Sequence, residues 1–113
     1  MSRLTLYAPF VFGLLLAVTG GLGMTGRLPK NDWFGIRMHD VMSSDAAWLA
    51  GHRAGGPWLL AGGLEALAAG VLLLVLGPDA ALGARIATVS LAVAFFLAGV
   101  AAWRAQSAAR RLI

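Results

Sequence analysis

The stretch from Gly26 to Pro57, GRLPKNDWFGIRMHDVMSSDAAWLAGHRAGGP, is the only long polar segment in a chain that otherwise consists of apolar runs. It holds four of the nine basic residues, three of the five acidic residues, both histidines and two of the four tryptophans. The apolar runs on either side decide the fold, because they have to be kept from water. We expect the features specific to this protein to lie between Gly26 and Pro57.

The composition places the chain in the membrane class. Its 113 residues suffice for one domain, 59% of them are hydrophobic and only 12% are charged, whereas soluble domains carry about 25% charged residues. The absence of cysteine excludes disulfides and thiolate metal sites. The net charge of +4 flanks the apolar runs, which indicates membrane topology and contact with anionic lipid rather than with nucleic acid.

Three apolar runs cover residues 4–24, 58–76 and 80–103. Each is close to the length of about 20 residues that a helix needs to cross the hydrocarbon core. Gly77-Pro78-Asp79 between the last two is a strong turn signal, so these runs form a tight antiparallel hairpin. The sequence predicts an all-α integral membrane protein of one domain (residues 1–113), with three transmembrane helices and a short cytoplasmic amphipathic segment within the loop 26–57.

The first run has one alternative interpretation. A basic residue followed by an apolar run, as at Arg3, is also the pattern of a secretory signal peptide. The run is long for such a peptide, and no clear A-x-A cleavage site precedes the polar segment. We therefore expect a membrane span.

Basic residues are distributed unequally between the two sides of such a three-span protein. The side with the N-terminus and the short turn holds only Arg3 and Arg85, and the side with the long loop and the C-terminal tail holds seven. Because short cytoplasmic segments are enriched in Lys and Arg, we expect the N-terminus outside and the loop and C-terminus in the cytoplasm. The seven residues are Arg27, Lys30, Arg37, Arg53, Arg104, Arg110 and Arg111.

Small residues recur every four positions on the second and third spans. Such spacing lets helix backbones approach closely in lipid, and the two stripes predict the interface of the hairpin. The abundance of alanine in the chain is the alternative explanation for any single pair. The stripes are Gly62, Ala66 and Gly70 on the second span and Ser90, Ala94, Ala98 and Ala102 on the third.

The loop contains a candidate helix of its own, over residues 45–54. Ser43 or Ser44 can cap its start, and Gly55-Gly56-Pro57 is expected to break it before the second span. Trp48 and His52 share one face of this helix, so we expect it to lie at the membrane interface with Trp48 dipped into lipid. Arg53 would then reach toward lipid phosphate, Arg37 or an acid. Three further tryptophans are candidate interface anchors: Trp33, Trp58 and Trp103.

The order N-x-x-x-G-x-R followed by W-x-x-x-H-R and a glycine resembles the signature of the SdpI family, small multi-pass bacterial membrane proteins named for an immunity protein against a secreted toxic peptide. The resemblance implies a place in the bacterial inner membrane and a loop that meets such a peptide or docks a cytoplasmic regulator. The chain departs from the family pattern after Arg37, where Thr-Pro and a further Thr are usual and Met38-His39-Asp40-Val41 stands here. The matching residues are Asn31, Gly35, Arg37, Trp48, His52, Arg53 and Gly56.

Glu65 is the one acidic residue inside a predicted span. A carboxylate at such a depth costs about 2.5–3.5 kcal/mol on insertion scales, which makes it a functional candidate. We expect it to face the bundle and to pair with Arg37, Arg53 or His52 folding back from the loop. The alternative is a protonated or shallow carboxyl that only hydrogen-bonds a neighbouring helix.

No other motif points to a cofactor or to catalysis. The two histidines are 13 residues apart and lack the compact spacing of zinc motifs, so we expect no metal site, no cofactor and no enzymatic activity. The polar residues considered as metal ligands are His39, Asp40, Asp45 and His52.

Three functions from different classes are consistent with the sequence. The first is an immunity or signalling protein whose loop binds a toxic peptide or a cytoplasmic regulator. The second is an accessory subunit that packs against a larger membrane complex through its small-residue stripes. The third is a minimal transporter that forms a homo-oligomer around Glu65. In each case the lipid bilayer is a partner and nucleic acid is not.

Overall fold

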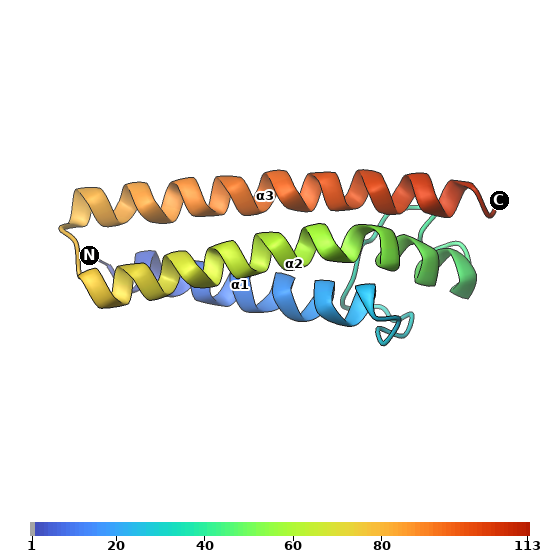
Figure 1. The fold of residues 1–113 in the computed structure, drawn as a ribbon, viewed down its shortest axis with the longest axis horizontal. Coiled ribbons are helices and arrows are strands. Elements are labelled where there is room, and N and C mark those ends of the chain that lie inside the picture. Colours follow the sequence, from blue (N-terminus) through green and yellow to red (C-terminus); the bar gives the residue numbers. More distant parts are fainter. Residues whose placement is uncertain (1) are drawn as a thin grey trace.

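The computed structural model describes residues 2–113 and folds them into three helices with no strand. They are α1 (Arg3–Met24), α2 (Asp45–Leu76) and α3 (Ala80–Arg110). The helices form a narrow bundle measuring 51 × 20 × 19 Å (Figure 1). All three are long and apolar enough to cross a membrane, which confirms the predicted all-α architecture with three spans.

The central helix is α2, because α1 and α3 both pack along it and make few contacts with each other. The start of α1 and the short turn between α2 and α3 lie at one end of the bundle, and the long loop and the C-terminus lie at the other (Figure 1). We call the second end the loop end. The polar segment of the sequence is therefore gathered at one end of an otherwise apolar bundle.

The predicted break at residues 55–57 is wrong, since α2 runs without interruption through Pro57. Two neighbouring helices pack closely on this segment. A Cβ atom on Gly55 would lie 2.6 Å from the carbonyl oxygen of Ala101 on α3, and one on Gly56 would lie 2.6 Å from the amide nitrogen of Met24 on α1. Pro57 removes one helical N–H, a loss that packing compensates in membrane helices. The loop shrinks to residues 25–44.

Glycines allow α1 and α2 to approach each other closely. A Cβ atom on Gly13 would lie 2.9 Å from the carbonyl oxygen of Gly63, and one on Gly20 would lie 2.6 Å from that of Gly56. The two glycines of each helix are seven residues apart, so they lie on one face of each helix. The sequence analysis considered only the interface between the second and third spans and missed this one.

The stripe predicted on α2 divides between two neighbours. Gly62 faces α3, where its Cβ position is 3.4 Å from the Cβ atom of Leu97, and Ala66 is fully buried. Gly70 departs from the prediction, because its Cβ position lies 3.0 Å from the ring of Phe10 on α1. A central helix has two packed faces, and a spacing of four residues does not stay on one of them.

The stripe predicted on α3 follows the interface for only half of the helix. Ser90 and Ala94 are buried, whereas Ala98 is half-buried and Ala101 and Ala105 take over as the fully buried residues. Each step of four residues turns the side chain by about 40° around the helix, so the predicted line drifts off the interface.

Both α2 and α3 are longer than the predicted spans. Their 32 and 31 residues correspond to more than 45 Å, roughly half as long again as a hydrocarbon core of about 30 Å. The additional turns are at the loop end: residues 45–57 of α2 and 104–110 of α3. The long loop packs on these turns.

Candidate functional site at the loop end

Asn31 shapes the first half of the loop. Its side-chain oxygen accepts hydrogen bonds from the backbone N–H groups of Trp33 (2.8 Å) and Phe34 (2.7 Å), and its side-chain nitrogen donates to the carbonyl of Pro29 (2.8 Å). An Asn side chain that bonds the backbone two and three residues ahead forms an Asx turn. The turn presents Trp33, which is 85% exposed, together with the exposed Phe34.

His52 fastens the middle of the loop to α2. Its Nε2 atom accepts a hydrogen bond from the N–H of Ile36 at 2.8 Å, and its Nδ1 atom lies 2.9 Å from the carbonyl oxygen of Trp48. An acceptor at Nε2 requires the proton at Nδ1, which then donates to that carbonyl. The neutral ring is 1% exposed and has both nitrogens satisfied, which is the signature of a structural histidine.

Gly35 is required for this contact on two grounds. Its φ of +120° is a backbone conformation that favours glycine. A Cβ atom at this position would lie 2.6 Å from the Trp48 ring and 2.7 Å from Nε2 of His52. The loop can reach the histidine because position 35 carries no side chain.

Trp48 is a core residue, and the prediction that it dips into lipid is wrong. It is 2% exposed, and its indole N–H donates to the carbonyl of Leu28 at 2.8 Å. Its ring stacks at a tilt on that of His52 with 4.2 Å between centroids, and the Arg37 guanidinium lies 5.9 Å from the Trp48 ring centroid. The loop covers the face of α2 that the sequence analysis assigned to the membrane.

The two arginines of the signature are its exposed members. Arg37 donates to the backbone carbonyl of Asn31 and is otherwise exposed. Arg53 is exposed and extends over Gly26, whose Cβ position is 3.0 Å from a guanidinium nitrogen. Four of the other signature residues hold the loop in place, the fifth, Gly56, packs against α1, and the arginines supply charge at the surface.

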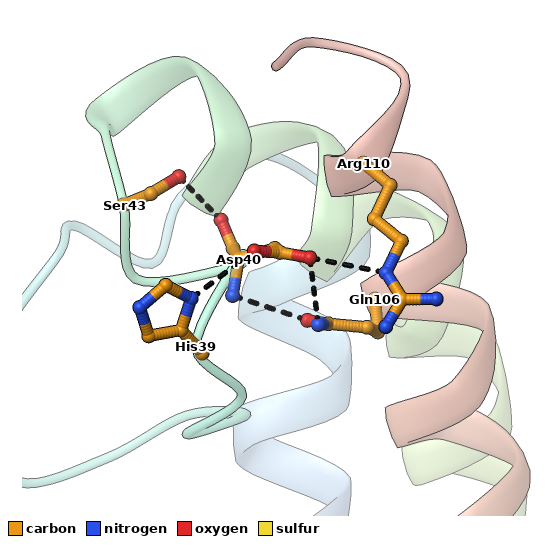
Figure 2. Close-up of polar contacts among 5 residues, drawn as sticks. All are labelled: His39, Asp40, Ser43, Gln106 and Arg110. Atoms are coloured by element: carbon orange, nitrogen blue, oxygen red, sulfur yellow. Dashed lines mark hydrogen bonds and ion pairs between the residues drawn. The ribbon is translucent and has the colours of Figure 1, made fainter.

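Asp40 joins the loop to α3, and sequence reasoning did not foresee this (Figure 2). Its carboxylate accepts hydrogen bonds from Gln106 (2.8 Å) and Arg110 (3.1 Å), while its backbone N–H donates to the side-chain oxygen of Gln106 (3.2 Å). Nδ1 of His39 lies 3.1 Å from the same carboxylate, and the Ser43 hydroxyl donates to the Asp40 carbonyl. His39, and after it Arg110, hold the pKa of Asp40 below its ordinary value of 3.8.

A small apolar core lies beneath this cluster. Val41 is fully buried between α2 and α3, where the Cβ position of Gly51 is 3.0 Å from a Val41 methyl group. Residues 101, 105 and 109 of α3, all alanine, are fully buried in the same core. The spacing of four in these alanines, continued past the apolar span, was the available signal that α3 extends and packs against the loop.

A groove lies between α1, α3 and the loop. The cavity has a volume of about 550 Å³ and is lined by loop residues, by α1, by α3 and by Leu59 of α2. A smaller apolar cavity of about 160 Å³ shares Leu16 and Ala98 with it and continues toward the middle of the bundle. The main lining residues from the loop are Trp33, Phe34, Gly35, Ile36, Arg37 and Met38.

Glu65 lies far from the loop, and the expected pairing with Arg37, Arg53 or His52 is wrong. Glu65 is 13 residues along α2 from His52, a separation of about 20 Å in a helix. The carboxylate instead lines a cavity with Arg85 and Ser90 of α3. The predicted anchors Trp58 and Trp103 are both exposed on the outer surface of the bundle.

The model of the SdpI/YfhL protein family matches residues 27–103, which include nearly all of the loop, all of α2 and most of α3. No curated protein and no solved structure shows significant similarity to the chain.

Proposed function

Because the chain belongs to the SdpI/YfhL protein family, we propose that it is an immunity protein that protects the membrane against a toxic peptide. Its binding surface would be the strip formed by the exposed loop residues Trp33, Phe34 and Arg37. In a signalling role, the same strip would bind a cytoplasmic regulator and hold it at the membrane. We propose further that the loop end faces the cytoplasm of a bacterial inner membrane. The seven basic residues at that end support this orientation.

The observation that carries the proposal is a loop that is fixed by hydrogen bonds and presents aromatic and basic side chains on its surface. Three hydrogen-bonded attachments, at Asn31, His52 and Asp40, fix the loop to itself, to α2 and to α3. Trp33, Phe34 and Arg37 are exposed side chains of the loop that also line a groove of about 550 Å³. A preorganised surface loses little conformational entropy on binding.

The chemistry of the strip suits a membrane-active peptide. Aromatic side chains and arginine are the residues that most often dominate binding energy at interfaces. The apolar groove leads from the strip between α1 and α3, so it can take the apolar face of an amphipathic peptide, while Arg37 offers donors to a carboxylate or carbonyl.

The experiment is a gentle-detergent pull-down of tagged protein with mass spectrometry, combined with a growth assay in the presence of the secreted peptides of the host. The test variant is Trp33→Ala with Phe34→Ala, which leaves the backbone hydrogen bonds to Asn31 in place. The matched control is Trp103→Ala, since Trp103 is 63% exposed and also lies beside an arginine, Arg104.

We expect wild type and the Trp103 control to retain a peptide or a soluble regulator that the loop variant loses. Growth protection should fall with the loss of a peptide. A large membrane complex retained by all three proteins would overturn the proposal and identify an accessory subunit.

A further inference from the structure

A second polar site lies in the seam between α2 and α3, away from the loop. The cavity has a volume of about 360 Å³ and is lined only by residues of these two helices. Glu65 is the eighth residue of the apolar run 58–76, so its backbone lies near the middle of the hydrocarbon core. The remaining lining residues are Ala69, Arg85, Ile86, Val89 and Ser90.

Among the residues that line this cavity, two buried polar atoms have no hydrogen-bond partner within residues 2–113. They are Oε2 of Glu65 and Oγ of Ser90, and Ser90 is only 4% exposed. The large majority of buried side-chain polar atoms in proteins are hydrogen-bonded, so two unpaired atoms at one cavity need an explanation. In hydrocarbon the need is greater, because no solvent is present to satisfy them.

Arg85 does not supply the missing partner. It is five residues before Ser90 on α3, about 7.5 Å nearer to the short turn. In the part of the chain that the structure describes, the acid of every ion pair is Asp40, so Glu65 and Arg85 are not paired. The unpaired oxygen of Glu65 therefore needs a hydrogen-bond donor from another molecule.

The depth and surroundings of the site define the chemistry of that donor. A basic side chain both neutralises a carboxylate and donates hydrogen bonds to it and to a hydroxyl. At this depth only a membrane-spanning helix can deliver such a group, since its own backbone is satisfied. The small residues Ala69 and Ser90 allow the close approach of a helix.

A second copy of this chain is a poor source of the base. If two copies are inserted in the same direction, Arg85 of the second copy lies at the same membrane depth as Arg85 of the first. Both arginines are then nearer to the short turn than Glu65. No other basic residue falls within the three apolar runs.

We propose that the seam at Glu65 and Ser90 binds a transmembrane helix of another protein or peptide that carries a Lys or Arg near its middle. The carboxylate of Glu65 pairs with the basic group, and the Ser90 hydroxyl accepts one of its remaining hydrogen bonds. This site is separate from the loop strip, so a Glu65 variant should retain the ligand of the loop.

The test uses the absence of cysteine in the natural sequence. A single cysteine introduced by Val89→Cys, an exposed residue that lines the cavity, reports on the seam. Phe95→Cys, equally outward on α3 but lining the apolar cavity on the α1 side, is the matched control. The probe is a synthetic Leu/Ala transmembrane peptide with one cysteine and a central Lys, compared with the same peptide carrying Leu instead, in liposomes with the full-length protein.

We expect the Lys peptide to form a disulfide with Val89→Cys about tenfold more efficiently than the Leu peptide, and to show no such preference at Phe95→Cys. Adding Glu65→Gln should remove the preference, and Ser90→Ala should reduce it about threefold. Arg85→Gln should keep or raise it, because a competing cation is lost. Helix content by circular dichroism checks that each variant is folded.

Three results would overturn the proposal. The first is equal disulfide formation by both peptides at Val89→Cys. The second is a Lys preference that survives Glu65→Gln in a folded protein. The third is efficient disulfide formation between two copies of Val89→Cys without peptide, which would show that the seam is the contact of a homo-oligomer.

Discussion

The polar groups at the loop end and those in the α2–α3 seam differ in one respect: the first are satisfied and the second are not. Both nitrogens of His52 and the carboxylate of Asp40 have partners within the chain. Oε2 of the half-buried Glu65 and Oγ of the buried Ser90 have no hydrogen-bond partner among residues 2–113. A satisfied buried network fixes a conformation, whereas unsatisfied groups are features of a site that is completed by a ligand.

This difference changes how the family signature is understood. Residues such as Trp48, His52 and Gly35 look like a binding motif in the sequence, but in the structure they hold the loop in place and are not free to bind a partner. The recognition surface that we propose consists instead of the exposed side chains of Trp33, Phe34 and Arg37. Substitutions in the signature should therefore first change stability, and substitutions in the strip should first change binding.

The largest effect is expected for Gly35→Val, which destroys the attachment of the loop. The new side chain meets the Trp48 ring and His52 at less than 3 Å and is forced to a φ of +120°. Strain and overpacking together should lower the free energy of unfolding by about 3 kcal/mol or more. Thermal unfolding in detergent measures the loss, and Gly99→Ala, at a position with open space around it, should change little.

The second effect is that of His52→Ala. It leaves the N–H of Ile36 and the carbonyl of Trp48 buried without their partners, which should destabilise the protein by about 2–3 kcal/mol. Unfolding followed by tryptophan fluorescence gives the value. His39→Ala removes a histidine whose side chain is exposed, so an equal loss in both variants would show that the hydrogen bonds of His52 are not the cause.

A smaller effect is expected from acidification at Asp40. Its pKa is lower in the folded protein than in the unfolded chain, so its contribution to stability is complete above pH 4 and is lost as the pH falls through the folded pKa. The loop should become more sensitive to an acid protease below about pH 4. Asp40→Asn should be cleaved at a rate that varies much less with pH over the same range.

The smallest effect, and one of opposite sign, is expected for Ser90→Ala. Removal of a buried hydroxyl without a partner should leave stability unchanged or raise it by up to about 1 kcal/mol in the absence of a ligand. Thermal unfolding in detergent decides this as well. A loss of more than about 1 kcal/mol would show that Ser90 already has a partner, and the contrast between the two regions would fail.

The number and approximate position of the membrane spans were predictable from the sequence because they depend on the lengths of apolar runs. Three runs of about 20 residues, separated by polar or turn residues, allow three spans and little else. The continuity of α2 was not predictable in the same way. Local rules assign a break to Gly55-Gly56-Pro57, and the packing of α1 and α3 on both glycines overrides them.

The contacts within the loop site could be predicted only in part. The sequence analysis placed Asn31 in the signature, and its Asx turn joins only neighbouring residues. The bonds of Asp40 to Gln106 join residues 66 positions apart, and nothing in their local sequence links them. The burial of Trp48 depends likewise on where the loop folds.

The sequence by itself determined that this is a three-span helical membrane protein with its polar residues gathered at one end, because hydrophobic burial and backbone satisfaction act along each segment alone. The tertiary structure decided which polar groups are satisfied within the chain. Hydrogen bonds and close packing between distant segments depend on distances of a few tenths of an ångström, and these exist only once α1, α2 and α3 are in contact.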